Sequence, residues 1–261
     1  MMKDILNEIL KKKKVEIEQL KESVPFERVH FKALETTREV ISLSRALQES
    51  PHGIIAEYKK KSPSKGWINE KSDPVIVTKM YQLSGASAIS ILTDSNFFGG
   101  HIDHIKRVRD SINIPILRKD FIIDPYQIAQ ARIAGADAIL LIATGLSKER
   151  CEELSEYAHT LGLEVLLEIH QTAELEFING NIDLVGVNNR NLGTFTTRLE
   201  TSMELINYIP KYKICISESG ISCPETVKRL REAGFKGFLI GENFMRESNP
   251  GTALKRFIQQ L

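Results

Sequence analysis

The sequence contains little cysteine and no excess of charge of either sign. It has only 3 cysteines in 261 residues, Cys151, Cys215 and Cys223, and no two of them have the C-x-x-C spacing. This small, odd number argues against disulfides and against a metal site built on cysteine, and it indicates reduced thiols in a cytoplasmic protein. Lys and Arg total 35 against 34 Asp and Glu, a net charge of +1. No overall field therefore attracts nucleic acid or an anionic membrane, and any anion must be bound locally.

Long apolar runs and metal-binding motifs are also missing. No stretch approaches the ~20 apolar residues that span a bilayer, and the N-terminus lacks the apolar core of a signal peptide. We therefore expect no membrane insertion. His101, His104 and His170 form no H-E-x-x-H motif and accompany no spaced carboxylate cluster. We expect no metal ion.

Short apolar runs recur after residue 50, and they predict the fold. The runs are GIIAEYK, SAISILT, IPILRKD, DAILLIA, EVLLEIH, DLVGVNN, YKICISES and KGFLIGE. Intervening segments such as DPYQIAQARIAGA open at a Ser or Asp cap and close at Gly, which is typical of helices. Strands that alternate with helices indicate a parallel sheet, and eight repeats spaced by about 20–33 residues indicate that the sheet closes.

We therefore predict an α/β protein, a (β/α)₈ TIM barrel that forms one domain over residues 1–261. An open, doubly wound sheet is the alternative, because the sequence does not display closure. No G-x-G-x-x-G motif follows the first predicted strand, however, as the dinucleotide-binding version of that fold would require.

Residues 1–50 precede the first predicted strand and are expected to form an N-terminal helical extension. Apolar residues near its start recur at nearly helical spacing, which predicts an amphipathic helix. They are Leu6, Ile9, Leu10, Ile17 and Leu20. Lys11 to Lys14 are interpreted as a solvated face of this helix rather than a basic binding patch. A second helical stretch is predicted over residues 36–50, TTREVISLSRALQES, and such an extension can cover one mouth of the barrel.

Polar residues stand where the predicted strands end, which is where reactive groups lie in barrels of this type. Because side chains alternate along a strand, each shares a face with apolar residues that would point inward, such as Ile55, Leu117, Leu166 and Ile216. The polar residues are Glu57, Lys59, Lys119, Glu168, Asn188, Arg190 and Glu218. Salt bridges that only tie the mouth together would explain any one of these charges. Two lysines and three carboxylates in one concave site favour catalysis, because their burial is costly.

Small residues follow the seventh and eighth predicted strands. Ser219 and Gly220 in SESGI, and Gly241 in LIGENFM, would let backbone N–H groups approach an anion ahead of helix N-termini. Each could be an ordinary turn, but the pair favours a phosphate site. Phe98 in NFFGG and Phe121 in KDFI would either line an aromatic pocket or pack beside the mouth.

The sequence resembles the indole-3-glycerol phosphate synthase family in seven strand-end motifs, in order, from about residue 54 to residue 246. The motifs are IIAEYKKKSPSKG, ILTDSNFFGG, LRKDFIIDPYQI, LLEIH, VGVNNRNL, SESGI and FLIGENFM. The resemblance implies a lyase of tryptophan biosynthesis that closes the ring of 1-(2-carboxyphenylamino)-1-deoxyribulose 5-phosphate, with loss of carbon dioxide and water. It implies a small-molecule phosphosugar–anthranilate substrate, no cofactor, and other tryptophan-pathway enzymes as possible partners.

The resemblance also implies a role for each matching residue. Lys119 would be the general acid of ring closure, with Glu57 and Lys59 helping to orient and protonate the substrate. Glu168 would be the acid–base group of the later steps. Which lysine acts in ring closure and which in dehydration stays open.

The remaining implied roles are in binding. Asn188 and Glu218 would hold polar groups of the intermediate. Ser62 and Arg190 would contact substrate. The contacts around the phosphate would be Ser219, Gly220 and Gly241, and those flanking the anthranilate ring would be Phe98 and Phe121.

Two other functions remain open. A Schiff-base aldolase would also place a lysine at a barrel mouth and act on a phosphosugar. A phosphosugar-binding protein without turnover would need the phosphate loops but none of the acid–base set, Glu57, Lys59, Lys119 and Glu168.

Overall fold

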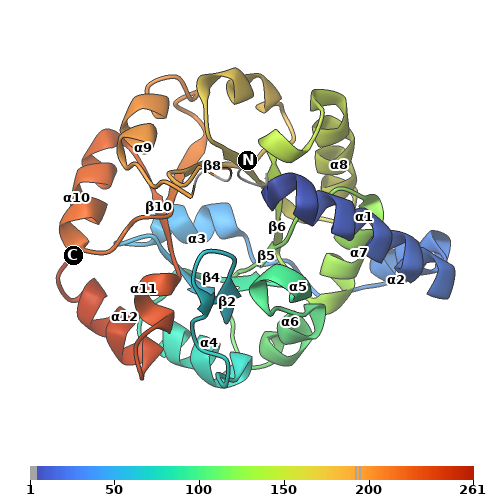
Figure 1. The fold of residues 1–261 in the computed structure, drawn as a ribbon, viewed down its shortest axis with the longest axis horizontal. Helices are drawn as coiled ribbons and strands as arrows, with labels where there is room; N and C mark the ends of the chain where they lie inside the picture. The colour runs from blue at the N-terminus through green and yellow to red at the C-terminus, as the bar shows by residue number, and fades with distance from the viewer. Residues whose placement is uncertain (1–4, 192, 194) are drawn as a thin grey trace.

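The structure is a computed structural model that describes residues 5–191, 193 and 195–261. Within these residues, eight parallel strands pair in the order β1-β10-β9-β8-β7-β6-β5-β4, and β1 pairs with both β10 and β4. The sheet is therefore closed, with helices around it (Figure 1). This confirms the predicted (β/α)₈ barrel and excludes the open sheet. The barrel strands are β1 (Ile54–Tyr58), β4 (Ala88–Leu92), β5 (Ile116–Lys119), β6 (Ala138–Ile142), β7 (Glu164–Ile169), β8 (Leu184–Asn188), β9 (Ile214–Glu218) and β10 (Gly237–Ile240).

Local sequence signals set the limits of the outer helices. Asp124 accepts a hydrogen bond from the Tyr126 N–H and forms a capping box with Gln127, and the helix that follows ends at Gly135 in the left-handed conformation. The outer helices are α4 (Pro74–Leu83), α5 (Ser95–Phe98), α6 (Ile102–Arg109), α7 (Pro125–Ala134), α8 (Lys148–Thr160), α9 (Glu200–Leu205), α10 (Pro224–Ala233), α11 (Glu242–Met245) and α12 (Pro250–Ile258). Short 3₁₀ helices η1 (Ala143–Gly145) and η2 (Thr172–Phe177) and a hairpin of β2 (Lys61–Ser62) and β3 (Gly66–Trp67) complete the connections.

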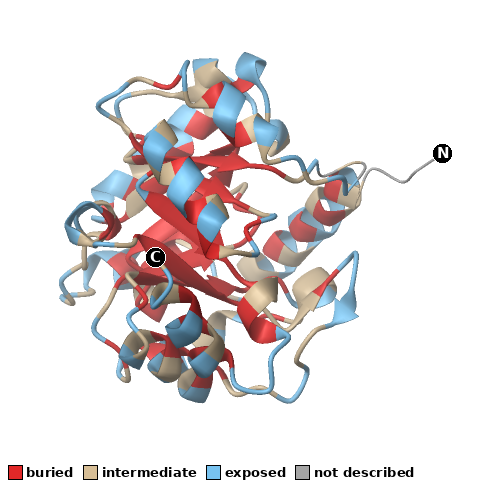
Figure 2. Ribbon diagram, turned by 90° about the vertical axis from the view of Figure 1, so that its left-hand side faces the viewer, coloured by how far each residue is buried: buried red, intermediate tan, exposed pale blue. Residues whose placement is uncertain are grey.

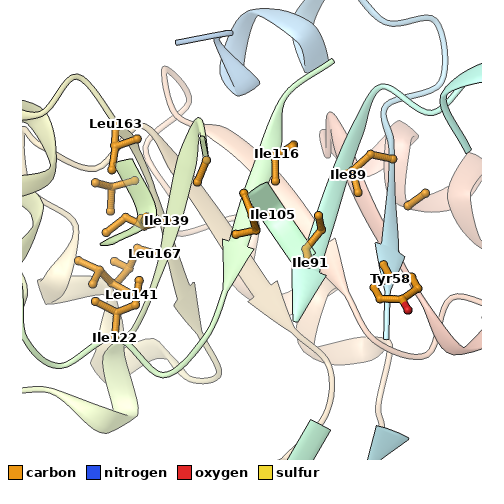
Figure 3. Packing of buried hydrophobic residues seen from close by; sticks show 14 of the residues in the cluster. Tyr58, Ile89, Ile91, Ile105, Ile116, Ile122, Ile139, Leu141, Leu163 and Leu167 are labelled. Atoms are coloured by element: carbon orange, nitrogen blue, oxygen red, sulfur yellow. The ribbon is translucent and has the colours of Figure 1, made fainter. Parts of the chain in front are cut away.

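The strands separate two hydrophobic cores, as the alternation of side chains requires. One core fills the barrel and contains Ile55, Leu117, Leu166 and Ile216. The predicted inward faces are therefore confirmed. The other core lies between the strands and the surrounding helices, and Figure 3 shows some of its residues, among them Ile89, Ile139 and Leu167. The strands accordingly form the buried centre of the molecule (Figure 2).

The N-terminal extension covers both ends of the barrel. Its described part, residues 5–50, forms α1 (Ile5–Ser23), α2 (Phe26–Leu34) and α3 (Leu43–Glu49). Leu6 and Ile9 of α1 join the inner core with Leu140 and Ile142, which lie toward the C-terminal ends of the strands. Leu43 and Leu47 of α3 join the same core from the other end, where Leu47 lies against Gly237 at the start of β10.

The prediction of a helix over residues 36–50 is wrong for its first half, and α2 was not foreseen. The side chain of Ser42 accepts a hydrogen bond from the Arg45 N–H, so it caps α3 and begins the helix there. In the segment before this cap, the Ile41 N–H and the Arg38 guanidinium donate hydrogen bonds to the Asp137 carboxylate. These distant contacts hold residues 36–42 outside a helix.

The interpretation of Lys11 to Lys14 as a solvated face is wrong at Lys13. The side chains of Lys11, Lys12 and Lys14 are exposed, but Lys13 is 2% exposed. Lys13 lies four residues after Ile9 and four before Ile17, so it falls on the buried stripe of α1.

No helix in the described ranges is long and apolar enough to cross a bilayer.

Candidate active site

A cavity of ≈ 370 Å³ opens at the C-terminal ends of the barrel strands. This volume is typical of a small-molecule site. Every site residue predicted from the sequence lines the cavity. They are Glu57, Lys59, Ser62, Phe98, Lys119, Phe121, Glu168, Asn188, Arg190, Glu218, Ser219, Gly220 and Gly241.

Lys119 is the centre of the charged cluster at the floor of the cavity. Its Nζ lies 3.2 Å from Glu168 Oε2 and 3.1 Å from Glu218 Oε2. These residues come from β5, β7 and β9, and Glu57 comes from β1. They are alternate strands of the ring, and alternate strands contribute the side chains of one layer in such barrels. The deeper layers of side chains in the barrel are apolar, whereas this layer, at the C-terminal ends of the strands, is charged.

Gly186 makes room for one member of the cluster. It occupies an inward position on β8, between the strands that carry Glu168 and Glu218. A Cβ atom at Gly186 would lie 2.3 Å from Glu218 Oε1, which is far inside contact distance. The glycine is therefore required for the Glu218 carboxylate to lie across the barrel toward Lys119.

Glu168 is held as an ionised carboxylate. Asn188 donates a 3.0 Å hydrogen bond from Nδ2 to Glu168 Oε1, and His170 Nε2 lies 3.3 Å from the same oxygen. Burial by itself raises the pKa of Glu168, but Lys119 and then His170 lower it well below its ordinary value. Glu168 therefore carries a negative charge in the cavity.

His170 is charged because it lies between two carboxylates. Burial alone lowers the pKa of His170, but the carboxylates of Glu168, 3.3 Å from Nε2, and Glu174, 3.6 Å from Nδ1, raise it to about 10. Glu174 is fixed in turn, because its Oε2 accepts from the His170 N–H at 2.6 Å and its Oε1 accepts from Thr144 Oγ1 at 2.5 Å. Histidine and carboxylates thus extend the charged cluster behind Glu168.

The pKa of Glu218 is shifted in the opposite direction to that of Glu168. Burial raises the pKa of Glu218 to about 7; Glu168 adds to this rise, while Lys119 opposes it. Burial alone lowers the pKa of Lys119, and the neighbouring carboxylates, Glu218 first, reverse this and raise it above its ordinary value. Two carboxyl groups whose pKa values are pushed apart are the usual basis for an acid and a base in one site.

Lys59 and Glu57 form a second ion pair in the cavity. Lys59 Nζ lies 2.6 Å from Glu57 Oε1. The Glu57 carboxylate lies against the backbone of Gly241, where a Cβ atom would be 2.3 Å from Glu57 Oε1. Gly241 therefore allows β1 and the loop after β10 to approach closely.

The side of the cavity formed after β9 and β10 is suited to an anion. Ser219 has a φ of +68°, and left-handed backbone is uncommon in residues other than glycine and clusters at ligand sites. Arg190 reaches this region from the end of β8 and donates from Nη1 to Ser64 Oγ at 3.2 Å, and Arg246 also lines the cavity.

The opposite side of the cavity is apolar. The rings of Phe98 and Phe121 lie 5.9 Å apart at an interplanar angle of 37°. Ile5, Leu6 and Ile9 of α1 close this side from above. A flat apolar ring would therefore be bound between the aromatic pair and α1.

Comparison with known proteins identifies the family. The family model described as "Indole-3-glycerol phosphate synthase" matches residues 6–257 of this chain. The chain belongs to the indole-3-glycerol phosphate synthase family. The resemblance inferred from the strand-end motifs is thereby confirmed.

Named relatives in the family are similar over the whole length. The indole-3-glycerol phosphate synthase of Bacteroides thetaiotaomicron is 52% identical over 260 residues, which cover 100% of both chains. That of Aliarcobacter butzleri is 44% identical over 97% of this chain and 98% of its own.

Solved structures with much lower identity share the fold. The tryptophan synthase α subunit of Legionella pneumophila superposes with a TM-score of 0.61 at 13% identity, covering 84% of this chain and 98% of its own. The 3-hexulose-6-phosphate synthase of Salmonella typhimurium gives 0.62 at 12% identity, covering 80% and 99%. These similarities support the barrel alone.

Beside the residues matched by family motifs, the structure adds others that the sequence did not reveal. Ile5, Leu6 and Ile9 lie in the extension, where the motif match was weakest, and only the position of α1 brings them to the site. His170 follows Glu168 by two residues in the LLEIH motif, and the sequence pattern gives no metal-binding role for it. That spacing on a strand was the available signal. Among the described residues, no three His, Cys, Asp or Glu side chains converge in a way that could hold a metal ion.

Proposed function

We propose that this cavity converts 1-(2-carboxyphenylamino)-1-deoxyribulose 5-phosphate into indole-3-glycerol phosphate, with Lys119 as the general acid of ring closure. The observation that carries the proposal is the Lys119 ammonium, which lies 3.1 and 3.2 Å from two buried carboxylates at the mouth of a barrel of this family. These contacts keep the ammonium protonated and fix its direction.

Ring closure requires a proton at the substrate carbonyl. Attack of the aromatic ring carbon on the carbonyl carbon forms the new C–C bond, and the C=O electron pair moves to oxygen. Lys119 delivers a proton there, and its charge stabilises the oxyanion as it develops. Loss of carbon dioxide then returns an electron pair to the ring and restores aromaticity without a cofactor.

Dehydration requires an acid and a base together. The hydroxyl leaves as water after protonation, and a base removes a proton from the ring carbon or nitrogen. Glu168 is suited to be the base, since Asn188 and His170 fix it as a carboxylate. Lys59 or Lys119 supplies the proton, and Glu218 holds polar groups of the intermediate.

The two ends of the cavity orient the substrate. The phosphate would bind at Ser219, Gly220 and Gly241, beside Arg190, and the anthranilate ring would bind between α1 and the touching rings of Phe98 and Phe121. The buried hydroxyl of Ser62 has no hydrogen-bond partner among the described residues, which leaves it available to the substrate.

The geometry disfavours the Schiff-base aldolase. A lysine attacks a carbonyl only as the free amine. Lys119 is held charged, and Lys59 is paired with Glu57 at 2.6 Å. A protein that only binds phosphosugars would have no use for this acid–base cluster. Enzymes that supply the substrate or consume the product are the protein partners we propose, with the cytoplasm as the compartment.

The test is turnover by the purified full-length protein. Addition of the carboxyphenylamino-deoxyribulose phosphate should produce indole fluorescence and one equivalent of carbon dioxide. Borohydride added with substrate should leave the lysines unmodified. Stable binding without indole formation would refute the proposed function, and covalent trapping on Lys59 or Lys119 would favour an aldolase.

A further inference from the structure

The buried lysine of α1 joins three separate parts of the cavity wall. Lys13 Nζ lies 3.1 Å from Asp94 Oδ2 and 3.1 Å from Asp120 Oδ1. Both carboxylates are almost completely buried, and Glu16 of α1, whose side chain is partly exposed, adds a third contact to Lys13 Nζ at 3.0 Å in this ionic cluster. Breaking such a cluster by removing one partner is costly, because a buried charge is left uncompensated.

Asp120 connects the cluster to the residue proposed as the general acid. It follows Lys119 directly in the chain, and its Oδ1 accepts a 2.8 Å hydrogen bond from the Phe121 N–H. Its Oδ2 accepts from Arg118 Nη2 at 2.9 Å and from Thr93 Oγ1 at 2.5 Å. The backbone just beyond Lys119 is therefore fixed by a carboxylate that Lys13 contacts.

Asp94 connects the cluster to the aromatic wall. Its Oδ1 accepts a 2.8 Å hydrogen bond from the Phe97 N–H and so caps α5. This short helix carries Phe98, whose ring lies against that of Phe121. Lys13 thus contacts the supports of both aromatic rings at once.

Helix α1, which carries Lys13, is the third part of the cavity wall that this lysine joins. Ile9 lies one turn before Lys13 on the buried stripe of α1, and Ile9 and Leu6 line the cavity. Pairing of Lys13 with Asp94 and Asp120 fixes the position of α1 relative to the barrel and the side of the helix that faces the cavity.

We propose that Lys13 is a positioning residue, which holds α1 and the Phe98 and Phe121 rings in register around the aromatic end of the substrate. This inference rests on the proposed function. An apolar residue at position 13 could pack in α1 but could not bind two carboxylates from different loops. The phosphate end of the cavity is built by β9, β10 and their loops, and among the described residues no ion pair of Lys13, Asp94 or Asp120 involves that end.

The inference predicts a loss of binding confined to one end of the site. Lys13→Met keeps the length of the side chain and removes its charge. We expect the KM for substrate and the Kd for anthranilate to rise at least tenfold, kcat to change less than about threefold, and the Kd for inorganic phosphate to stay within twofold. Lys14→Met places the same change on the exposed face of α1 and should leave all four values within twofold.

A second variant covers the case in which Lys13→Met does not fold. Lys13→Met/Asp94→Asn removes one uncompensated charge but keeps a side-chain oxygen that can cap α5, and it should show the same selective loss of anthranilate binding. The inference would be overturned by a folded variant that binds anthranilate within twofold of the parent, or by equal losses of anthranilate and phosphate affinity. Failure of both variants to fold would also overturn it, because Lys13 would then serve folding rather than positioning. A parent protein without turnover would refute the proposed function, whereas the two fragment affinities would still decide the role of Lys13.

Discussion

Replacement of Lys119 by methionine tests the central assignment of the site. The change keeps the length and apolar stem of the side chain but removes its charge and its proton. General acid catalysis contributes about 10²–10⁴-fold, and stabilisation of the oxyanion adds to this. We therefore expect kcat to fall at least roughly a hundredfold, with a smaller change in the affinity for a non-reactive substrate analogue.

The structure also predicts how this variant changes stability. Lys119 is the shared partner of Glu168 and Glu218, at 3.2 and 3.1 Å. Removing one partner of a buried ion pair costs about 3–5 kcal/mol. Part of this loss disappears if a carboxyl takes up a proton, and Glu218 does so most readily because burial already raises its pKa to about 7. Lys119→Met should therefore be destabilised more at pH 8 than at pH 5.

The assay combines steady-state kinetics with circular dichroism and melting curves at both pH values. Lys119→Met/Glu218→Gln is the control for stability, because it removes the lysine together with one of its carboxylates. It should melt closer to the parent at pH 8 and remain inactive. If Lys119→Met is well folded and turns over within about fivefold of the parent, Lys119 is not the acid, and Lys59 becomes the leading candidate.

Three further predictions concern the same cavity. Because the folded-state pKa of Glu218 is raised from 4.5 to about 7, the folded state binds this proton more tightly than the unfolded state, and the contribution of Glu218 to stability falls as pH rises between those values. Glu218→Gln should gain on the order of 1–3 kcal/mol relative to the parent from pH 5 to pH 8, and an equal offset in denaturant unfolding at both pH values would contradict this. Gly241→Asp should weaken substrate and inorganic phosphate binding by on the order of 1–3 kcal/mol, because its carboxylate repels the phosphate. Gly241→Ala is the control for crowding against Glu57. Unchanged affinity in the Asp variant would place the phosphate elsewhere. Turnover should survive EDTA, since lysine ammonium groups supply the acid, and activity lost in EDTA and restored by one divalent metal would disprove this.

The sequence predicted the barrel and the positions of most site residues because both follow from local, periodic rules. Side chains alternate along a strand, so Glu57 and Glu168 had to share a face with Ile55 and Leu166 whatever the rest of the chain did. Eight such strands with helices between them leave few other arrangements. The inward faces, and the gathering of polar residues at one mouth, therefore follow from the sequence alone.

Tertiary structure decided which charges are buried and what each one contacts. Lys13 stands among four consecutive lysines, and its spacing from Ile9 and Ile17 places it on the apolar stripe of α1. Only the fold supplies the carboxylates that compensate its buried charge, because Asp94 and Asp120 lie more than 80 residues away in the chain. The same holds for the opposite pKa shifts of Glu168 and Glu218. Both are carboxylates at strand ends, and only their distances to Lys119, to His170 and to each other separate them. Periodicity is fixed by neighbours along the chain, whereas electrostatic energy depends on distances through space that only the folded chain sets.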